Sequence, residues 1–356
     1  MHFEALLKRH RVTALAYAGL CTAGITLPSD VAASLARSAL VATRNALVKA
    51  RETLRLQRVF DEAAVPALFV KGSTLAILVY GSLGVKESWD IDLLTTPQKA
   101  LAARDILFQL GYDLVSPAGL EDRKFRDFTK LSKEAIFLNR RLSVAVELHW
   151  LLVDNEYLLP GITAHSQAQP VPVGGGFVRT LQDEILFAYL CVHGTVHAWG
   201  RLKWLADVGA FLGKRSEAEI DRFYRAAIAL GAGRCPAVAL LLCYRLFGLQ
   251  LPSLLLREIE ASRITNALVA NSFSALMHPA ATPSVYSIAN LRRLVARFFL
   301  QPRARYIRAE IRLVWTSRAD RMLLNLPRRL TFLYHLLRVP LWLWRAGSRI
   351  VHPRIQ

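Results

Sequence analysis

The sequence predicts an α+β fold, in which a small mixed β-sheet is flanked by helices and followed by a helical C-terminal region. Segments of strand length, with apolar runs or apolar–polar alternation, lie between residues 67 and 148. Beyond residue 176 the apolar residues instead recur at helical spacing. Hydrophobic residues make up 53% of the 356 residues, which is enough core material for two or three domains and excludes a disordered chain.

Residues 1–60 are expected to form an N-terminal helical segment. Residues 12–27 follow a basic stretch and imitate a signal peptide, but threonines, glycines and a tyrosine dilute the apolar run. We therefore interpret this stretch as a helix packed on the core, with a cleaved signal peptide as the alternative. Residues 29–64 carry apolar side chains at three- and four-residue intervals, which predicts one or two helices. No run reaches the roughly 20 apolar residues of a membrane span.

Residues 61–173 are predicted to form the core that holds the sheet. In order, we expect a strand at 67–70, a helix at 74–80, a strand at 90–94, a helix at 97–110 closed by Gly111, a strand at 112–115, a strand or hairpin within 121–142, and a strand at 144–148. The proline- and glycine-rich run 158–176 predicts a loop and a domain boundary. A helical domain at 174–265 and an arginine-rich helical region at 266–356 follow, and Thr180 to Asp183 predict a capping box.

A short segment combines a glycine turn with a pair of aspartates. Gly72 and Ser73 end an apolar run and begin a helical stretch, and such a turn with free backbone N–H groups can receive a triphosphate. Asp90 and Asp92 are two residues apart on a predicted strand, so both carboxylates leave the same face. Two carboxylates this close repel unless a cation lies between them, and hard oxygen ligands suit Mg²⁺ or Mn²⁺. Because an Asp→Asn substitution at position 90 or 92 relieves this repulsion, we expect little loss of melting temperature from either.

The same segment resembles the DNA polymerase beta-like nucleotidyltransferase superfamily, and within it a stand-alone bacterial nucleotidyltransferase family. Lys71, Gly72 and Ser73 match the family's turn, Tyr80 and Gly81 its loop, and residues 90–94 (DIDLL) its strand. The spacer from Ser73 to Asp90 is longer than in the shortest members of the superfamily, and Lys86 stands where the family usually has arginine. The resemblance implies nucleotide contacts by Lys71, Gly72, Ser73 and Lys86, with an NTP such as ATP as substrate.

A third carboxylate is expected at Glu147. Residues 143–150 (SVAVELHW) alternate, so that Glu147 and His149 share one face of a strand, and the resemblance extends to a similar Glu-Leu-His-Trp stretch. Asp90, Asp92 and Glu147 are therefore the candidate catalytic and metal-binding residues. The alternative is an edge strand with a solvated glutamate.

His193 and His197 lie four residues apart on a predicted helix. No third ligand and no intervening glutamate support a metal site there, so packing at a helix interface is the simpler interpretation. The resemblance to the nucleotidyltransferase family extends to residues 190–207, which match a segment of that family. If this helix closes over the nucleotide, His193, His197, Arg201 or Lys203 would contact its phosphates or base.

Positive charge gathers at the C-terminal end. The whole chain carries a net charge of +19, and residues 291–356 hold 15 arginines against Glu310 and Asp320, a net +13. Aromatic residues, Trp342 and Trp344 among them, are interleaved, which favours weak contact with an anionic membrane surface over nucleic-acid binding. The alternative is a packed helical tail with solvated arginines. We expect truncation near Pro302 to spare the chemistry if other helices cover the core.

These observations predict a metal-dependent nucleotidyltransferase that moves an NMP group to a hydroxyl or similar acceptor on a small molecule or protein and releases pyrophosphate. The alternatives are a catalytically degenerate nucleotide-binding module, or a basic adaptor for membrane surfaces or nucleic acid. The four widely spaced cysteines predict buried free thiols in a reducing cytoplasm. The expected location is the cytoplasm, with peripheral contact to the inner face of the membrane.

Overall fold

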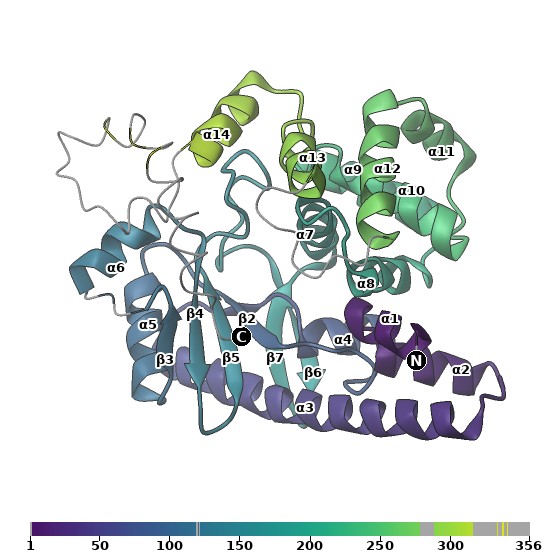
Figure 1. Ribbon diagram of the computed structural model, residues 1–356. Coiled ribbons are helices and arrows are strands. Elements are labelled where there is room, and N and C mark those ends of the chain that lie inside the picture. Colours follow the sequence, from purple (N-terminus) through teal and green to yellow (C-terminus); the bar gives the residue numbers. More distant parts are fainter. Residues whose placement is uncertain are drawn as a thin grey trace.

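The computed structural model describes residues 2–118, 120, 122–277 and 288–315, together with residues 333, 337 and 340. It has the predicted α+β fold, with a five-stranded mixed sheet, a two-stranded sheet and surrounding helices (Figure 1). Trp342 and Trp344, and most of the arginine-rich tail, lie outside the described residues. Among the described residues, no helix is both long and apolar enough to cross a bilayer.

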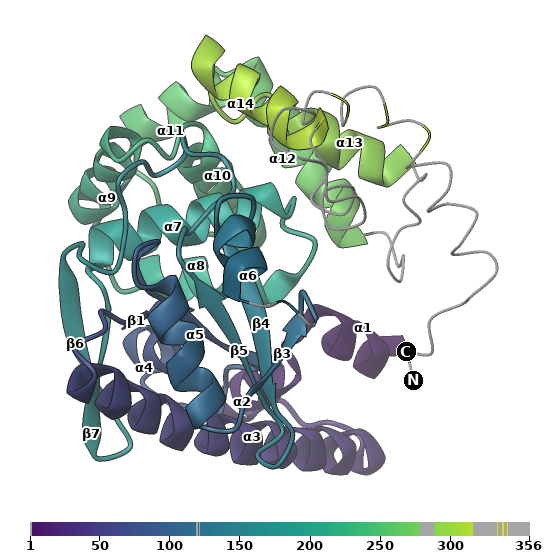
Figure 2. The same ribbon diagram turned by 90° about the vertical axis from the view of Figure 1, so that its left-hand side faces the viewer.

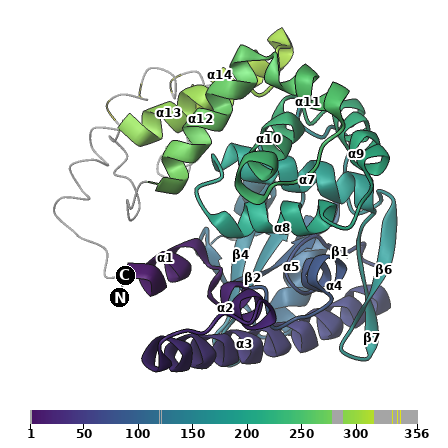
Figure 3. The ribbon, with the colours of Figure 1, turned by 90° about the vertical axis from the view of Figure 1, so that its right-hand side faces the viewer.

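The N-terminal segment is helical, as predicted. It comprises α1 (His2–His10), α2 (Thr13–Thr22) and the long α3 (Ser29–Glu62). Figure 3 shows α1 and α2 beside the N-terminal half of α3, and Leu7, Val12 and Leu35 form a small core between them. Cys21, predicted to be buried, is exposed on α2, whereas the other three cysteines are buried free thiols.

The five-stranded sheet has the order β1-β2-β5-β4-β3. Its strands are β1 (Leu68–Phe69), β2 (Asp90–Leu94), β3 (Asp113–Ser116), β4 (Glu134–Asn139) and β5 (Val144–His149), and the helices between them are α4 (Ser73–Tyr80), α5 (Ala100–Gln109) and α6 (Asp122–Thr129). Only β2 and β5 run parallel, and β1–β2, β3–β4 and β4–β5 are antiparallel. The prediction of a strand or hairpin within 121–142 is wrong in its first half, because α6 buries Phe125 and Phe128 against Trp150.

Alternation along the strands gives the sheet two different faces. Ile91, Leu93, Val146 and Leu148 point into a core shared with α3 and α5, which cover this side of the sheet (Figure 2). The residues between them on β2 and β5, which include Asp90, Asp92 and Glu147, therefore point to the opposite face. Because the apolar face of the sheet is buried, the acidic side chains are on the face that remains available for a functional site.

The run 158–176 was predicted to be a loop, and this is wrong for its second half. Residues Ala168–Val173 (β6) and Gly176–Leu181 (β7) form an antiparallel hairpin that packs on β1, α3 and α4. The predicted boundary between residues 173 and 174 falls at the turn of this hairpin. Thr180 belongs to β7, so the predicted capping box is also wrong, and Gln182 precedes the next helix without a side-chain cap.

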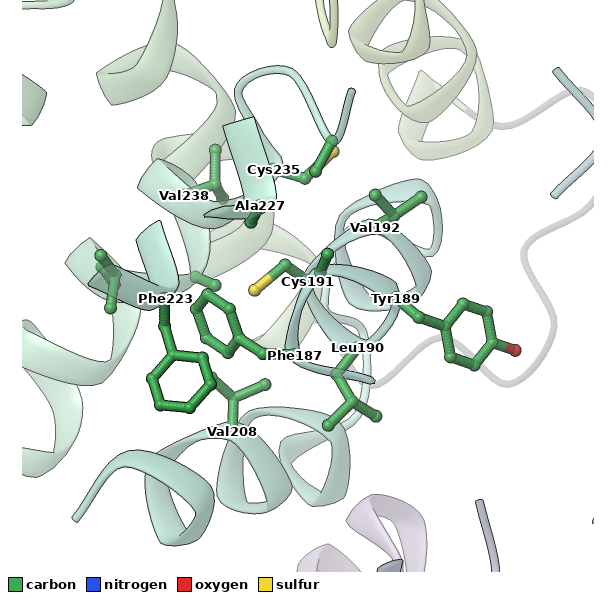
Figure 4. Close-up of a cluster of buried hydrophobic side chains, with 14 of the residues drawn as sticks. Phe187, Tyr189, Leu190, Cys191, Val192, Val208, Phe223, Ala227, Cys235 and Val238 are labelled. Carbon is green, nitrogen blue, oxygen red and sulfur yellow. The ribbon is translucent and has the colours of Figure 1, made fainter. Parts of the chain in front are cut away.

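A helical part lies over the other face of the sheet (Figure 1). It contains α7 (Asp183–Val196), α8 (Leu202–Leu212), α9 (Glu217–Ala229), α10 (Cys235–Phe247), α11 (Ser253–Glu260), α12 (Arg263–Met277), α13 (Ile288–Arg297) and α14 (Ala304–Trp315). Phe187, Cys191 and Phe223 lie at its centre, whereas the ring of Tyr189 points away from this cluster (Figure 4). The helical part thus presents α7 and α8 toward the acidic face of the sheet.

The described part of the arginine-rich region is packed on this helical core. Tyr306 of α14 is fully buried, and Glu310 is buried with its Oε1 2.7 Å from Nε of Arg297. The Nδ2 of Asn155 donates to the other oxygen of Glu310 at 2.9 Å. Residues 288–315 therefore follow the alternative of a packed helical tail, with arginines such as Arg305 on the exposed side.

Candidate functional site

Three predicted carboxylates meet on the open face of the sheet. Asp92 on β2 is the register partner of Glu147 on the adjacent parallel strand β5, and Asp90 precedes Asp92 on the same face. Asp92 is 2% exposed, whereas Asp90 and Glu147 are partly exposed. The structure therefore brings together the residues that strand periodicity and the resemblance selected separately.

Lys71 provides the closest positive charge to this group. Its Nζ lies 2.8 Å from Oδ1 of Asp92 and 5.7 Å from the centre of the Tyr189 ring. Burial opposes ionisation of both partners, but their mutual attraction prevails, so the pKa of Lys71 is well above and that of Asp92 below its ordinary value. Both groups are charged at neutral pH.

The negative charge of Asp90 is only partly compensated by nearby cations. Burial, followed by the charges of Asp92 and Glu147, raises the pKa of Asp90 to about 6. Lys71 acts on Asp90 only weakly by comparison, since it is bound to Asp92. A carboxylate whose pKa is raised by burial and by neighbouring carboxylates marks a position where a cation would be stabilised.

His149 lies beneath the carboxylates and is fully buried. Its Nε2 is 3.3 Å from Oδ1 of Asp92 and 3.5 Å from Oε2 of Glu147, and its Nδ1 is 3.1 Å from Oε2 of Glu134. Burial and Lys133 lower its pKa, but the three carboxylates outweigh them and raise it to about 10. His149 is therefore an imidazolium, which orients acidic groups on either side of it.

Glu134 was missed in the sequence. It lies on β4 directly opposite His149 of β5, so its carboxylate reaches the far side of the imidazolium. Lys133 binds the same carboxylate. The alternation on 144–148 placed His149 on the acidic face, but only the β4–β5 register shows which residue of β4 meets it.

The donor set suits a hard divalent cation. Asp92, Glu147 and His149 offer ligand atoms within 4.8 Å of one another, a trio that shares two members with the predicted Asp90, Asp92 and Glu147. Oδ1 of Asp92 is buried and makes no aligned hydrogen bond to any described residue. Because an imidazolium has no free lone pair, His149 fits the role of orienting the carboxylates, which are the better ligands for Mg²⁺ or Mn²⁺.

The glycine turn lies against the backbone of Asp90, the first aspartate of the pair. Gly72 has φ +67°, and a Cβ at this position would lie 3.8 Å from the carbonyl oxygen of Asp90. Helix α4 begins at Ser73, and its first N–H groups have no partner within the helix. The turn is held from behind by Thr74, whose hydroxyl donates to the carbonyl of Phe69 at 2.8 Å. A phosphate at this helix start would lie beside the acidic group.

Comparison with known families agrees with this arrangement. A family described as uncharacterised nucleotidyltransferases matches residues 2–248. The chain belongs to this family. No curated protein is similar enough to count as a match. The matched range contains every predicted site residue, from Lys71 to His197, and ends before α11.

Further cations surround the acidic group of this nucleotidyltransferase. The negative charge of Asp90 acts to raise the pKa of four basic side chains, which are Arg11, Lys49, Arg201 and Lys203. None of the four forms an ion pair with another residue in the described part of the chain. Burial, followed by Lys86 and Arg11, lowers the pKa of Lys203 to about 7. Arg11 and Lys49 were missed in the sequence because they lie on the N-terminal helical segment, more than 20 residues before the glycine turn.

Lys86, which was predicted to contact phosphate, is paired with an aspartate instead. Its ammonium is buried against the carboxylate of Asp207 on α8, which also accepts a hydrogen bond from the Tyr80 hydroxyl at 3.1 Å. Lys86 still lines a narrow cavity together with Lys71 and Asp90. Its charge is already matched, so direct phosphate contact by Lys86 stays a prediction.

His193 and His197 form an aromatic cluster with Trp204. The His193 ring centre is 4.8 Å from that of His197 and 5.4 Å from that of Trp204. Burial, followed by Lys71 and His197, lowers the pKa of His193 well below its ordinary value, so this ring is neutral. His197 is exposed. The structure therefore places a partly open cluster of mutually tilted aromatic rings on the helical part, and no described third ligand joins the two histidines.

Proposed function

We propose that this family member transfers an NMP group from an NTP to a hydroxyl or similar acceptor, with release of pyrophosphate. The observation that carries the proposal is the meeting of the Gly72–Ser73 helix start with Asp90, Asp92 and Glu147 on one face of the sheet. The resemblance to the DNA polymerase beta-like superfamily supports the same reaction. In it the acceptor oxygen bonds to the α-phosphorus, the bond from that phosphorus to the bridging oxygen breaks, and the hydroxyl proton passes to solvent.

Asp90, Asp92 and Glu147 would hold Mg²⁺ or Mn²⁺. Such ions, when bound, lower the pKa of an attacking hydroxyl and neutralise charge on the transferred phosphoryl group. The raised pKa of Asp90 supports this assignment, because burial and the charges of Asp92 and Glu147 oppose its ionisation and a bound cation would favour it. Lys71 neutralises part of the same charge, through Asp92.

The other residues of the site would bind and orient the nucleotide. Ser73 and the first N–H groups of α4 would hold phosphate oxygens. Arg11, Lys49, Arg201 and Lys203 would offset the negative charge of the triphosphate. His149 and Glu134 would act as positioning residues that keep Asp92 and Glu147 ionised and aimed at one point.

A panel of the four NTPs with Mg²⁺ or Mn²⁺, assayed for pyrophosphate release with candidate acceptors, tests the proposal. We expect release that requires the divalent ion and stops on addition of a chelator. Nucleotide binding without release under every condition would instead support the second candidate, a catalytically degenerate nucleotide-binding module. That candidate is favoured by one observation, the direct contact of Lys71 with Asp92, which competes with a cation for the same oxygen.

Nucleotide binding should be accompanied by proton uptake at pH 8. Lys203, with its pKa at about 7, is mostly neutral at this pH, and a triphosphate beside it would raise the pKa and draw in up to about one proton. Calorimetry in two buffers of different ionisation heat measures this uptake. Lys203→Gln should lose most of it, and an equal uptake in wild type and variant would contradict the placement of phosphates near Lys203.

The aromatic cluster gives a test of base contact. If the base stacks on the exposed ring of His197, His197→Ala should raise the dissociation constant of the NTP roughly tenfold, the scale of one lost stacking contact. His165→Ala, an exposed histidine outside the cluster, is the matched control. Unchanged affinity and turnover in His197→Ala would remove His193 and His197 from the nucleotide site.

A further inference from the structure

A second and larger cavity adjoins the carboxylates on the side of the N-terminal helices. Its volume is about 620 Å³, and it lies among α1, α3, the loop before β2 and the turn before β5; we call it the α1–α3 cavity. Figure 3 shows α1 above the N-terminal half of α3. The lining residues that matter here are Lys8, Arg37, Lys49, Glu87, Ser88 and Trp89. Its volume is typical of sites for small molecules.

Positive charge dominates the walls of this cavity. Lys8, Arg37 and Lys49 form no ion pair with any described residue. The one acidic side chain, Glu87, is already engaged, because its Oε1 accepts hydrogen bonds from the backbone N–H groups of Thr13 at 2.7 Å and Ala14 at 3.3 Å. Glu87, the only acidic residue among the lining residues, is thus bound by the N–H groups at the start of α2. The three cations Lys8, Arg37 and Lys49 remain to attract an anion.

The cavity adjoins the proposed reaction centre. Lys49 and Ser88 line both this cavity and the narrow one beside Lys71, Gly72 and Asp90. The hydroxyl of Ser88 donates to the carbonyl oxygen of Asp90 at 2.7 Å, so the wall of the α1–α3 cavity ends at the first aspartate. The narrow cavity has a volume of about 10 Å³, which is room for about one water molecule, whereas the α1–α3 cavity is large enough for a small molecule beside Ser88.

An aromatic wall completes the cavity. Trp89 is 67% exposed, and the Arg11 guanidinium lies 4.2 Å from the centre of its ring. An exposed indole beside the first aspartate offers a flat apolar surface to the carbon skeleton of a small molecule. No described core residue requires Trp89 in this place, since its ring is not among the buried side chains.

We propose that the α1–α3 cavity binds the acceptor, and that the acceptor is a small hydroxyl compound carrying a phosphate group. The assignment rests on the proposed nucleotidyl transfer and names its second substrate. The phosphate lies between Lys8 and Arg37, the carbon skeleton lies on Trp89, and the hydroxyl points past Ser88 toward Asp90.

Titration of the full-length protein with inorganic phosphate and with glycerol 3-phosphate, followed by calorimetry, tests this assignment. The nucleotide site is first saturated with α,β-methylene-ATP and Mg²⁺, so that added phosphate reports the remaining anion site. Lys8→Gln and Arg37→Gln should each weaken binding of both probes about tenfold. Arg58→Gln removes an exposed arginine from the same helix but outside the cavity, and should leave binding unchanged.

The possible outcomes test the acceptor assignment and the proposed nucleotidyl transfer independently. Equal probe binding, or no binding, in wild type, Arg37→Gln and Arg58→Gln overturns the acceptor assignment, even if pyrophosphate release is observed. Weaker binding of the ATP analogue in Arg37→Gln also overturns it, because the cavity would then hold the nucleotide. Probe binding that depends on Arg37, in a protein that releases no pyrophosphate with any NTP, supports the anion site while the proposed transfer fails.

Discussion

Asp92→Asn should lower the rate of metal-dependent pyrophosphate release about 10³-fold or more. Asp92 is the carboxylate at which Lys71, His149 and the register partner Glu147 converge, so its charge organises the whole acidic group. A loss of this size corresponds to several kcal/mol of transition-state stabilisation. Asp90→Asn should cause a similar loss, whereas Asp127→Asn, an exposed aspartate on α6, is the control that should keep full activity.

The two variants should differ in stability. Asp90→Asn removes a charge that its neighbours oppose, so the melting temperature should be kept or rise. Asp92→Asn leaves the buried charges of Lys71 and His149 without their shared partner, so the melting temperature should fall. Near-normal pyrophosphate release by Asp92→Asn with every NTP that the wild type uses would refute the catalytic assignment.

Tyr306→Ala should lower the free energy of unfolding by about 3–5 kcal/mol, the usual cost of emptying a large buried aromatic site. Tyr306 is fully buried in the core of the helical part, and its hydroxyl donates to the carbonyl of Arg297 at 2.5 Å. Urea unfolding measures the change. Tyr306→Phe should cost only about 1 kcal/mol, because it removes the hydrogen bond and keeps the packing.

A change on the exposed side of the same helix serves as the control. Ile311 is 50% exposed, so Ile311→Ala should cost less than about 1 kcal/mol. Equal effects of Tyr306→Ala and Ile311→Ala would show that α14 does not dock as described. This packing bears on the condition attached to truncation near Pro302, that the remaining helices cover the core, because the cut would remove the buried Tyr306 and Glu310.

Local patterns in the sequence were sufficient for the acidic strand and the glycine turn. Strand periodicity alone sends Asp90 and Asp92 to one face, and the helical spacing after Gly72 predicts α4 almost to its ends. Both signals arise from geometry within one element, which depends on the order of residues and not on partners far away in the chain.

Contacts between distant segments were decided only by the tertiary structure. Glu134 meets His149 through the register of β4 on β5, and Lys86 meets Asp207 across 121 residues. Pro170 and Pro172 locally indicate a loop, yet both lie at exposed positions of the hairpin strand β6, where a proline is tolerated. Register, burial and charge pairing are properties of two or more elements together, so no single stretch of sequence contains them.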